Sequence, residues 1–279
     1  MKRNKILWWA LGVGFLVLIA AAMYILPLFR FFMASEEIKL NDNLYVITGA
    51  GNSGILITEK AIVVIDTKMG SAAEKLADRA KELAGNKPVV VINTHLHGDH
   101  VKGNYLYPGS EIFMGAYDTL FLRKEVEEEN LPVFLVEDSV TLDMGDELLV
   151  LRNMGSAHTY ADLVVYLPYH QILFTGDLVL NKVNPPLFKN AGASVDGWIN
   201  VLQILDENYH PLTVIPGHGN PGGTELIDNL LGYFNDMKSA AKDPQRKKEL
   251  MAKYDDWFKN PLMASPSKTI DFILNEQKK

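Results

Sequence analysis

The feature that most constrains this chain is a run of candidate metal ligands that follows a predicted buried strand. The run reads Thr94-His-Leu-His-Gly-Asp-His, and the segment before it, Pro88–Asn93, is apolar and β-branched. Such a segment is typical of a strand that is buried on both faces. Functional residues often lie in loops at the ends of rigid elements. Gly98 permits a tight turn, so we expect the acidic residue and the last histidine to lie beside the first two histidines.

The side chains of this run are His95, His97, Asp99 and His100. Imidazoles this close together would repel one another once protonated, whereas a bound cation keeps them neutral and ligated. The sequence therefore predicts a metal centre, and one short loop of this kind can supply two adjacent ions. The chain has no cysteine. Imidazole and carboxylate ligands without thiolate suit zinc and, less selectively, iron or manganese.

Three further residues are predicted to join this loop. His158, Asp177 and His218 each adjoin a predicted strand beside a glycine or another small residue. We therefore expect all three to converge on one edge of the fold. The two remaining histidines have structural interpretations, because His170 lies in a predicted hairpin turn and His210 lies at the end of a predicted helix.

The predicted strands are short apolar or alternating segments bounded by turn residues. They are Leu44–Thr48, Gly54–Thr58, Ala61–Asp66, Pro88–Asn93, Glu111–Met114, Ser139–Leu142, Glu147–Arg152, Asp162–Leu167, Gln171–Thr175 and Thr213–Pro216. Apolar residues at helical spacing predict helices over Ser71–Ala84, Tyr117–Glu128, Ser194–Glu207 and Thr224–Met237. Strands followed by a helix, twice over, predict an α/β (α+β) fold in which two mixed sheets lie between helices, a four-layer αββα sandwich.

The N-terminus has the sequence of a membrane segment. The run Ile6–Phe29 carries no charge and few polar atoms. Roughly 20 apolar residues are enough to cross a bilayer as a helix. Basic residues within Met1–Lys5 place the N-terminus in the cytoplasm by the positive-inside rule. We therefore predict one transmembrane helix within residues 1–34, with the remainder of the chain outside the cytoplasm. The alternative is a signal peptide cleaved at Ala20-Ala21-Ala22, which would leave a secreted protein.

The C-terminal residues differ from the rest in composition. Asp243-Pro244 is typical of an N-cap followed by proline at the first helical position, and Ser267–Glu276 has the pattern of an amphipathic helix. We therefore divide the chain into a membrane anchor (1–34), a domain that carries the metal centre (35–237) and a C-terminal helical extension (238–279).

The net charge argues against one class of partner. The chain has 279 residues and a formal net charge of −7, whereas proteins that grip nucleic acid usually present a basic face. We therefore expect a small-molecule substrate and no nucleic acid, with the membrane contacted through the N-terminal helix.

The order HxHxDH, then His, Asp and His, resembles the metallo-β-lactamase superfamily from about residue 44 to about residue 236. The resemblance implies two ions: one is held by His95, His97 and His158, the second by Asp99, His100 and His218, and Asp177 bridges them. It also implies a dinuclear zinc hydrolase whose bridging hydroxide cleaves a cyclic amide, lactone, ester or thioester bond. In this reading Asp99 is also catalytic, because its carboxylate orients the hydroxide.

The resemblance leaves three alternatives open, namely a β-lactamase proper, a metal-bound redox protein and a non-enzymatic binding protein on the same fold. Zinc β-lactamases that carry a metal-binding cysteine have it where Asp177 stands here, and they have a lysine where Leu180 stands. The bridging aspartate is more similar to hydrolases of thioesters, lactones and phosphodiesters. Oxygen-reducing diiron members have a glutamate where His97 stands. Candidate substrate contacts are Asn104, Tyr105, Tyr160, Lys182 and Lys189.

Overall fold

The computed structural model forms two compact units, Met1–Ala34 and Ser35–Lys279. The predicted transmembrane helix and the predicted helix Tyr117–Glu128 lie almost entirely outside the residues that the structure describes. Among the described residues, no helix combines the length and the apolar character needed to cross a bilayer. The structure describes residues 14, 15, 19, 35–49, 51–117, 127–128, 131–132, 134–260 and 263–276.

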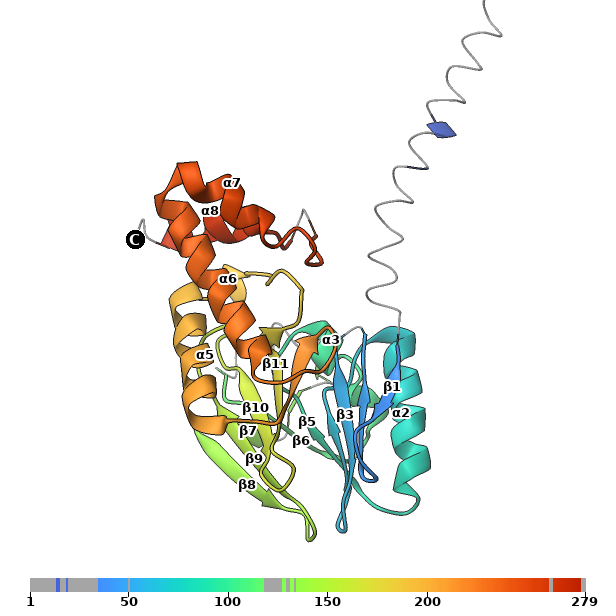
Figure 1. The fold of residues 1–279 in the computed structure, drawn as a ribbon. Coiled ribbons are helices and arrows are strands. Elements are labelled where there is room, and N and C mark those ends of the chain that lie inside the picture. The colour runs from blue at the N-terminus through green and yellow to red at the C-terminus, as the bar shows by residue number, and fades with distance from the viewer. Residues whose placement is uncertain are drawn as a thin grey trace, which may run out of the picture. The chain divides into compact units, whose positions relative to one another are not determined.

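The first sheet runs in chain order from β1 to β7 (Figure 1). Its strands from β1 to β4 pair antiparallel, and those from β4 to β7 pair parallel. The two edge strands, β1 and β7, were not predicted, because each has only three residues, too few to show a strand periodicity. The bounds are β1 (Glu37–Lys39), β2 (Leu44–Ile47), β3 (Ser53–Ile57), β4 (Ile62–Ile65), β5 (Val89–Ile92), β6 (Glu111–Gly115) and β7 (Phe134–Val136).

The second sheet has the order β12-β11-β10-β9-β8. Only β11 and β12 pair parallel, and the helix α5 (Val195–Tyr209) provides the crossover that a parallel pair requires. The other pairs are antiparallel. The bounds are β8 (Ser139–Asp143), β9 (Leu148–Asn153), β10 (Leu163–Leu167), β11 (Ile172–Leu180) and β12 (Thr213–His218).

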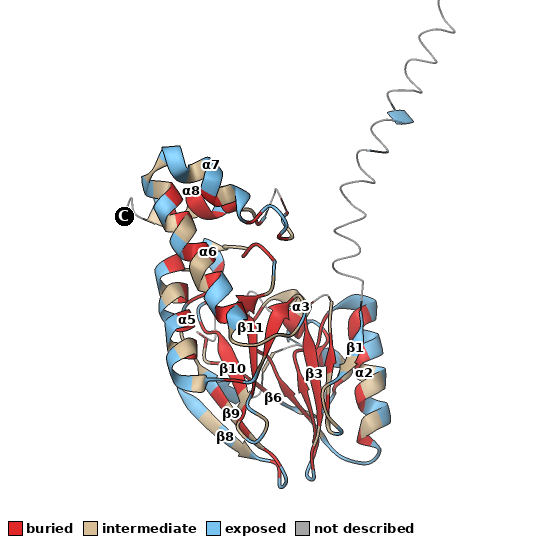
Figure 2. Ribbon diagram, in the orientation of Figure 1, coloured by how far each residue is buried: buried red, intermediate tan, exposed pale blue. Residues whose placement is uncertain are grey.

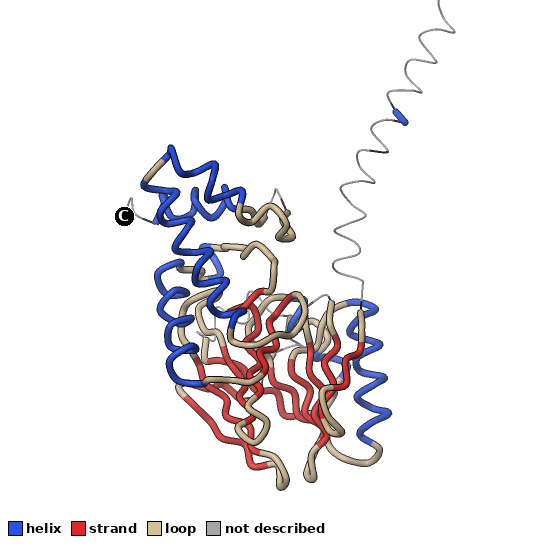
Figure 3. Tube along the Cα trace, viewed as in Figure 1, coloured by secondary structure: helices blue, strands red, loops and turns tan. Residues whose placement is uncertain are grey.

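Helices cover the outer faces of the two sheets (Figure 3). Helix α2 (Gly70–Ala84) lies on the outer face of the first sheet, and α5 and α6 (Glu225–Lys242) lie on the outer face of the second. This confirms the predicted sandwich of two sheets between helices. Shorter helical segments are α3 (Gly98–Val101), η1 (Asn104–Leu106) and η3 (Lys189–Ala191).

The main core lies between the sheets (Figure 2). A second cluster joins α2 to the first sheet, where Leu76 and Ala80 pack against Ile62 and Val64. These helical positions are four residues apart, so they share one face of α2. The core between the sheets includes Leu56, Val63, Ile92, Leu149, Val165 and Phe174.

The C-terminal residues belong to the same compact unit as the sandwich. Helix α6 continues through position 238, and α7 (Pro244–Ala252) begins at the predicted N-cap, where the Asp243 carboxylate accepts a hydrogen bond from the amide of Gln245 (3.0 Å). Helix α8 (Pro266–Glu276) matches the predicted amphipathic helix within one residue at its start.

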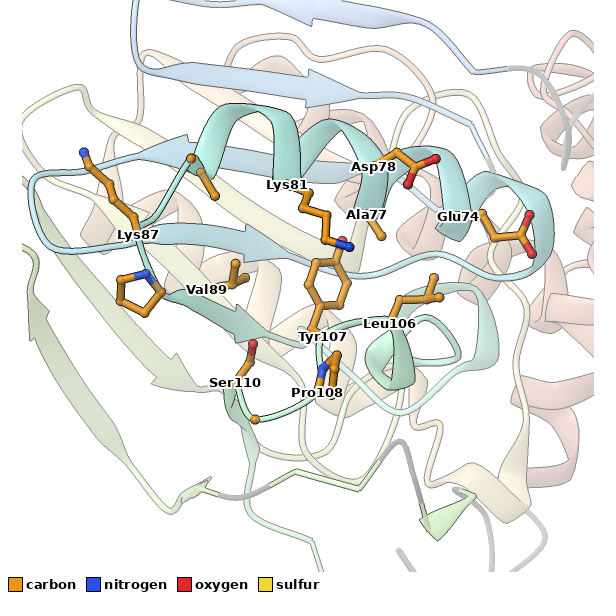
Figure 4. Close-up of a pocket in the computed structure, with 14 residues that line it drawn as sticks. Glu74, Ala77, Asp78, Lys81, Lys87, Val89, Leu106, Tyr107, Pro108 and Ser110 are labelled. Atoms are coloured by element: carbon orange, nitrogen blue, oxygen red, sulfur yellow. The ribbon is translucent and has the colours of Figure 1, made fainter.

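A pocket of about 720 Å³ lies on the outer side of the first sheet, between α2 and the segment that contains η1 (Figure 4). The side chains of Lys81 and Tyr107 extend toward each other there. None of the predicted metal ligands lines this pocket.

We expect Gly103→Ala to destabilise the protein. A Cβ at Gly103 would lie 2.1 Å from the carbonyl oxygen of Thr67 and 2.9 Å from Cβ of Ala73, and overpacking of this kind costs about 1–3 kcal/mol. Gly232→Ala is the matched control: its Cβ has nothing within 4 Å, and alanine in a helix interior is favoured over glycine by about 0.5–1 kcal/mol. Urea unfolding of the full-length chain checks both. Equal midpoints for the Gly103 variant and the wild type would contradict the close packing at this position.

Candidate metal centre

The HxHxDH run lies in the connection from β5 through α3. The backbone carbonyl of His100 accepts hydrogen bonds from the amide of Thr67 (2.8 Å) and from Nδ2 of Asn93 (3.0 Å). The Asn93 side-chain oxygen in turn accepts from Nδ2 of Asn104 (2.8 Å). All of these groups are buried. The loop is therefore fixed to its neighbours by hydrogen bonds on the side away from the histidine rings.

Asp177 and His218 come from the adjacent parallel strands β11 and β12. Both strands run further than predicted, so Asp177 lies inside β11 and His218 is the last residue of β12. The register of this pair shifts around Gly176, which has φ 51°. Such irregularities re-aim a side chain. A Cβ at Gly217 would lie 2.0 Å from Oδ1 of Asp177, so glycine at this position leaves the space that the carboxylate occupies.

The structure brings all the predicted ligands together in two groups. His95, His97, His158 and Asp177 form the first group, and Asp99, His100 and His218 form the second. In the first group, Nδ1 of His97 lies 2.8 Å from Nε2 of His158. In the second, Oδ2 of Asp99 lies 3.2 Å from Nε2 of His218 and 3.9 Å from Nε2 of His100.

The carboxylate of Asp177 stands between the groups. Its Oδ2 lies 3.4 Å from Nε2 of His158 and 3.9 Å from Nε2 of His95. Its Oδ1 lies 3.3 Å from Nε2 of His100 and 3.5 Å from Nε2 of His218. Each oxygen therefore faces the ring nitrogens of a different group.

These distances fit a zinc site. Zinc bonds of 2.0–2.1 Å in a tetrahedron place neighbouring ligand atoms about 3.4 Å apart. Most of the nitrogen–oxygen distances here lie close to that value, and all but the 3.2 Å between Asp99 and His218 exceed the length of a hydrogen bond. Furthermore, Nε2 of His95, Nε2 of His100 and Oδ1 of Asp177 are buried without a hydrogen-bond partner. Buried polar atoms are normally satisfied, so these orphaned atoms indicate a cation.

The imidazoles of the first group are held neutral. Burial, followed by the neighbouring His100, lowers the pKa of His95 well below its ordinary value. Burial and then His97 lower the pKa of His158 to about 3. Neutral imidazole is the form that binds metal. The electrostatics of these two residues therefore favour metal ligation.

The carboxylates are held ionised. Burial alone would raise the pKa of Asp99, but His100 and His218 outweigh it, and the net pKa is lowered. The pKa of Asp177 is lowered well below its ordinary value, because His218 and His100 outweigh its burial in the same way. Burial opposes protonation of His100, yet Asp66, Asp177 and Asp99 together raise its pKa well above the ordinary value. Negative charge therefore concentrates around the second group.

Asp66 is a supporting residue that sequence reasoning missed. Its Oδ2 lies 2.8 Å from Nδ1 of His100, and the carboxylate accepts hydrogen bonds from the amide (2.7 Å) and the hydroxyl (2.7 Å) of Thr94. A carboxylate on the far nitrogen of a ligating histidine fixes the ring orientation and tautomer. The sequence feature that could have indicated this role is an aspartate directly after the buried strand β4.

Asp162 supports His158 through the backbone. Its carboxylate accepts from the amides of His158 (2.7 Å) and Thr159 (2.9 Å) and from the Thr159 hydroxyl (2.6 Å). Burial is the largest effect on Asp162 and raises its pKa to about 6. The ring of Trp198 lies 5.0 Å from that of His158, centroid to centroid. The signal here was an aspartate four residues after His158.

A buried lysine holds the turn between β2 and β3. Nζ of Lys68 donates hydrogen bonds to the carbonyls of Gly49 and Gly51. A Cβ at Gly51 would lie 3.1 Å from Nε2 of His100, so this turn lies against the metal centre. Burial lowers the pKa of Lys68 to about 7, although Asp66 and Asp99 act in the opposite direction.

Two of the five candidate substrate contacts are engaged in interactions with other residues of the protein. Asn104 is buried and bonds with Asn93 and Thr67, so it supports the metal loop and the prediction that it contacts substrate was wrong. Lys182 pairs with Asp256 (2.9 Å). Phe188 lies edge-on to His97 with the ring centroids 5.6 Å apart.

The two histidines outside the cluster lie where they were predicted, in a hairpin turn and at the end of a helix. Nε2 of His170 lies 2.5 Å from the buried carboxylate of Glu147. His210 is exposed and forms the left-handed C-cap of α5, with φ 40°.

Known proteins resemble this chain in sequence and in fold. The model of the metallo-beta-lactamase superfamily matches residues 46–218. A metallo-beta-lactamase type 2 from Bacteroides fragilis is 26% identical over 236 residues, which cover 76% of this chain and 94% of that protein. A human acyl-coenzyme A thioesterase is 21% identical over 231 residues, 70% of this chain and 82% of that protein.

A solved structure of a metallo-beta-lactamase has a similar fold. The metallo-beta-lactamase from Pontibacter korlensis superposes with a TM-score of 0.63 and 25% identity, and the match covers 72% of this chain and 99% of that one. The family match spans more than half of the chain and contains all the residues of the two ligand groups. The chain therefore belongs to the metallo-beta-lactamase superfamily and is one of its metallo-hydrolases.

Proposed function

We propose that this chain is a dinuclear zinc hydrolase that cleaves a lactone, ester, thioester or cyclic amide bond. The observation that carries the proposal is the carboxylate of Asp177, whose two oxygens face the ring nitrogens of different ligand groups. A carboxylate in this position suits a bridge between two ions. His95, His97 and His158 would hold the first ion, and Asp99, His100 and His218 the second.

Zinc in such a site supplies a water of pKa near 7 and polarises a substrate carbonyl. The protein side chains then determine how water and substrate lie. The Asp99 side chain is 18% exposed, against 4% for Asp177, so Asp99 is the more accessible carboxylate. Because it is held ionised, Asp99 would accept a hydrogen bond from the attacking water and orient it. The Phe188 ring lies edge-on beside His97 on this side of the site.

The substrate class rests on the residues after Asp177. Leu180 is buried, with 1% exposure, and stands where the cysteine-bearing β-lactamases of the resemblance have a lysine for the substrate carboxylate. Lys182 is engaged with Asp256. These two residues favour an acyl substrate without the carboxylate of a β-lactam. A thioesterase among the relatives supports this class, whereas the β-lactamases among them make β-lactam cleavage the second candidate.

We also propose that residues 1–34 anchor the chain in a membrane and that the remainder lies outside the cytoplasm. The support is the sequence itself, in which the apolar run Ile6–Phe29 follows the basic residues of Met1–Lys5. A span of this length and a flank of this charge fit an uncleaved anchor with a cytoplasmic N-terminus.

We expect chelation to abolish hydrolysis and added zinc to restore it. The zinc-loaded full-length chain is offered a lactone, a thioester, a β-lactam and, as a contrast, a phosphodiester. Turnover of an acyl substrate by loaded but not by chelated protein supports the proposal. If zinc is bound and none of the acyl substrates is cleaved, the proposed reaction is wrong. Iron in the protein as isolated would favour the redox alternative.

We expect His97→Ala to lower turnover by more than about 100-fold, because even residues that only support a ligand are worth 10–100-fold in affinity or activity. The zinc content should fall from two ions to about one per chain, and far-UV circular dichroism should be unchanged. His210→Asn is the matched control, because asparagine is tolerated in a left-handed C-cap and His210 lies outside both ligand groups. Undiminished turnover in the His97 variant would exclude the assigned role.

We expect the chain expressed in a bacterial host to remain in the membrane pellet after alkaline washing. Protease added outside the cytoplasm should digest residues 35–279, because the positive-inside rule exports them. A shortened chain in the soluble exported fraction would instead indicate signal-peptide cleavage. A full-length chain in the cytosol would refute both versions of the export proposal.

A further inference from the structure

The wall beside the first ligand group is a loop, residues 181–194, that joins β11 to α5. It begins four residues after Asp177 and contains η3. Its Phe188 lies edge-on to His97, at an interplanar angle of 83°. The position of this loop therefore determines which substrate can approach the first ligand group.

The C-terminal extension holds the beginning of this loop. The amide of Phe258 donates to the carbonyl of Lys182 (2.7 Å), and the carbonyl of Phe258 accepts from the amide (2.9 Å) and from Nδ2 (3.0 Å) of Asn184. The two segments thus pair as a short parallel bridge at Val183. Asn184 is fully buried, and its side-chain bond to Phe258 is partly buried. Figure 1 shows the segment after α7 lying beside the loop that follows β11.

An aromatic cluster fixes the segment that makes this bridge. Trp257 stacks on Tyr233 of α6, with ring centroids 5.2 Å apart and planes at 15°. Tyr254 packs edge-on to both rings, at 4.8 Å from Tyr233 and 4.9 Å from Trp257. The hydroxyl of Tyr233 lies 2.8 Å from that of Thr269 in α8. The segment is therefore tied to both α6 and α8.

The extension also contacts the chain directly after the loop. Oε2 of Glu276 accepts a hydrogen bond from the amide of Val195 (3.3 Å), the first residue of α5. Further along α5, Trp198 packs against His158. The extension thus holds the loop near both of its ends, and the match to the superfamily model stops before the extension begins, at residue 218.

We propose that the C-terminal extension, residues 238–279, is a built-in support that positions the loop 181–194 and so sets substrate binding at the metal centre. The proposal rests on the proposed hydrolytic function, since it assigns the extension to the same site. The described residues of the extension contribute to neither ligand group. It acts through the Phe258 bridge and through Phe188, so loosening it changes substrate binding more than it changes the chemistry or the zinc content.

The test is Trp257→Ala in the zinc-loaded full-length chain. Removal of the indole frees the segment that contains Phe258, so we expect amide hydrogen exchange of residues 183–188 to accelerate at least about tenfold, as local opening becomes easier. KM should rise about five- to tenfold with kcat within about twofold, the pattern of lost uniform binding. Zinc content should stay at the wild-type value.

Two variants serve as controls. Trp257→Phe keeps an aromatic ring against Tyr233 and should restore both exchange and KM. Tyr169→Ala removes an exposed aromatic side chain in the β10–β11 turn, where the ring is 64% exposed, and should change neither. If Trp257→Ala does not fold, Asn184→Leu removes the Nδ2 donor from the loop side of the bridge and is subjected to the same measurements.

Faster exchange of residues 183–188 without any change in KM would overturn the proposal, as would wild-type exchange in Trp257→Ala or, where that variant does not fold, in Asn184→Leu. A wild-type protein that hydrolyses nothing would instead refute the proposed function. In that case the exchange rates and the affinity for a competitive zinc-directed thiol still decide whether the extension controls the loop and access to the site.

Discussion

The clustering of five imidazoles and two carboxylates, most of them buried, is the constraint on which the rest of this structure depends. Each buried polar atom that lacks a partner costs about 1–3 kcal/mol, and here His95, His100 and Asp177 each present such an atom. The local charges already prepare these groups for a cation, since the pKa of His95 is lowered and those of Asp99 and Asp177 are lowered as well. A cation removes the cost for all of them at once, so metal binding and the native packing of the site are coupled.

The fold provides this convergence by bringing strand ends from both sheets to one edge. The HxHxDH loop leaves β5 of the first sheet, whereas Asp177 and His218 come from β11 and β12 of the second. Close approach between these strands requires small residues, and Gly51 and Gly217 leave the space for His100 and Asp177 respectively. The hydrogen bond of Asp66 then fixes the orientation of the His100 ring, and those of Asp162 hold the backbone at His158.

The ligand cluster could be predicted from the sequence, whereas the residues that support it could not. Both outcomes have physical reasons. Dense ligands in a short loop have few structural explanations, so the HxHxDH run and its partners were predicted correctly as a cluster. The ends of β11 were misplaced, because the bulge at Gly176 continues the strand past a glycine that normally marks a turn. Asp66 and Lys68 were missed because their partners, His100 and the turn at Gly51, are distant in sequence. Pattern and spacing report local structure, whereas a single buried carboxylate gains its meaning only from tertiary contacts.

The chain divides chemistry and selectivity between different segments. The ligand groups lie entirely within the part that matches the superfamily, so they account for a reaction that many hydrolases share. What distinguishes one such enzyme from another is the surface that the substrate meets, and here that surface depends on residues after Asp177. Leu180 is buried and Lys182 is paired with Asp256, so neither offers a free cation to the substrate. The loop that contains Phe188 is held at its start by the backbone of Phe258, outside the superfamily match. Because a metal site tolerates little movement of its ligands while a substrate wall can change freely, the C-terminal extension is where this chain can vary its substrate without altering its chemistry.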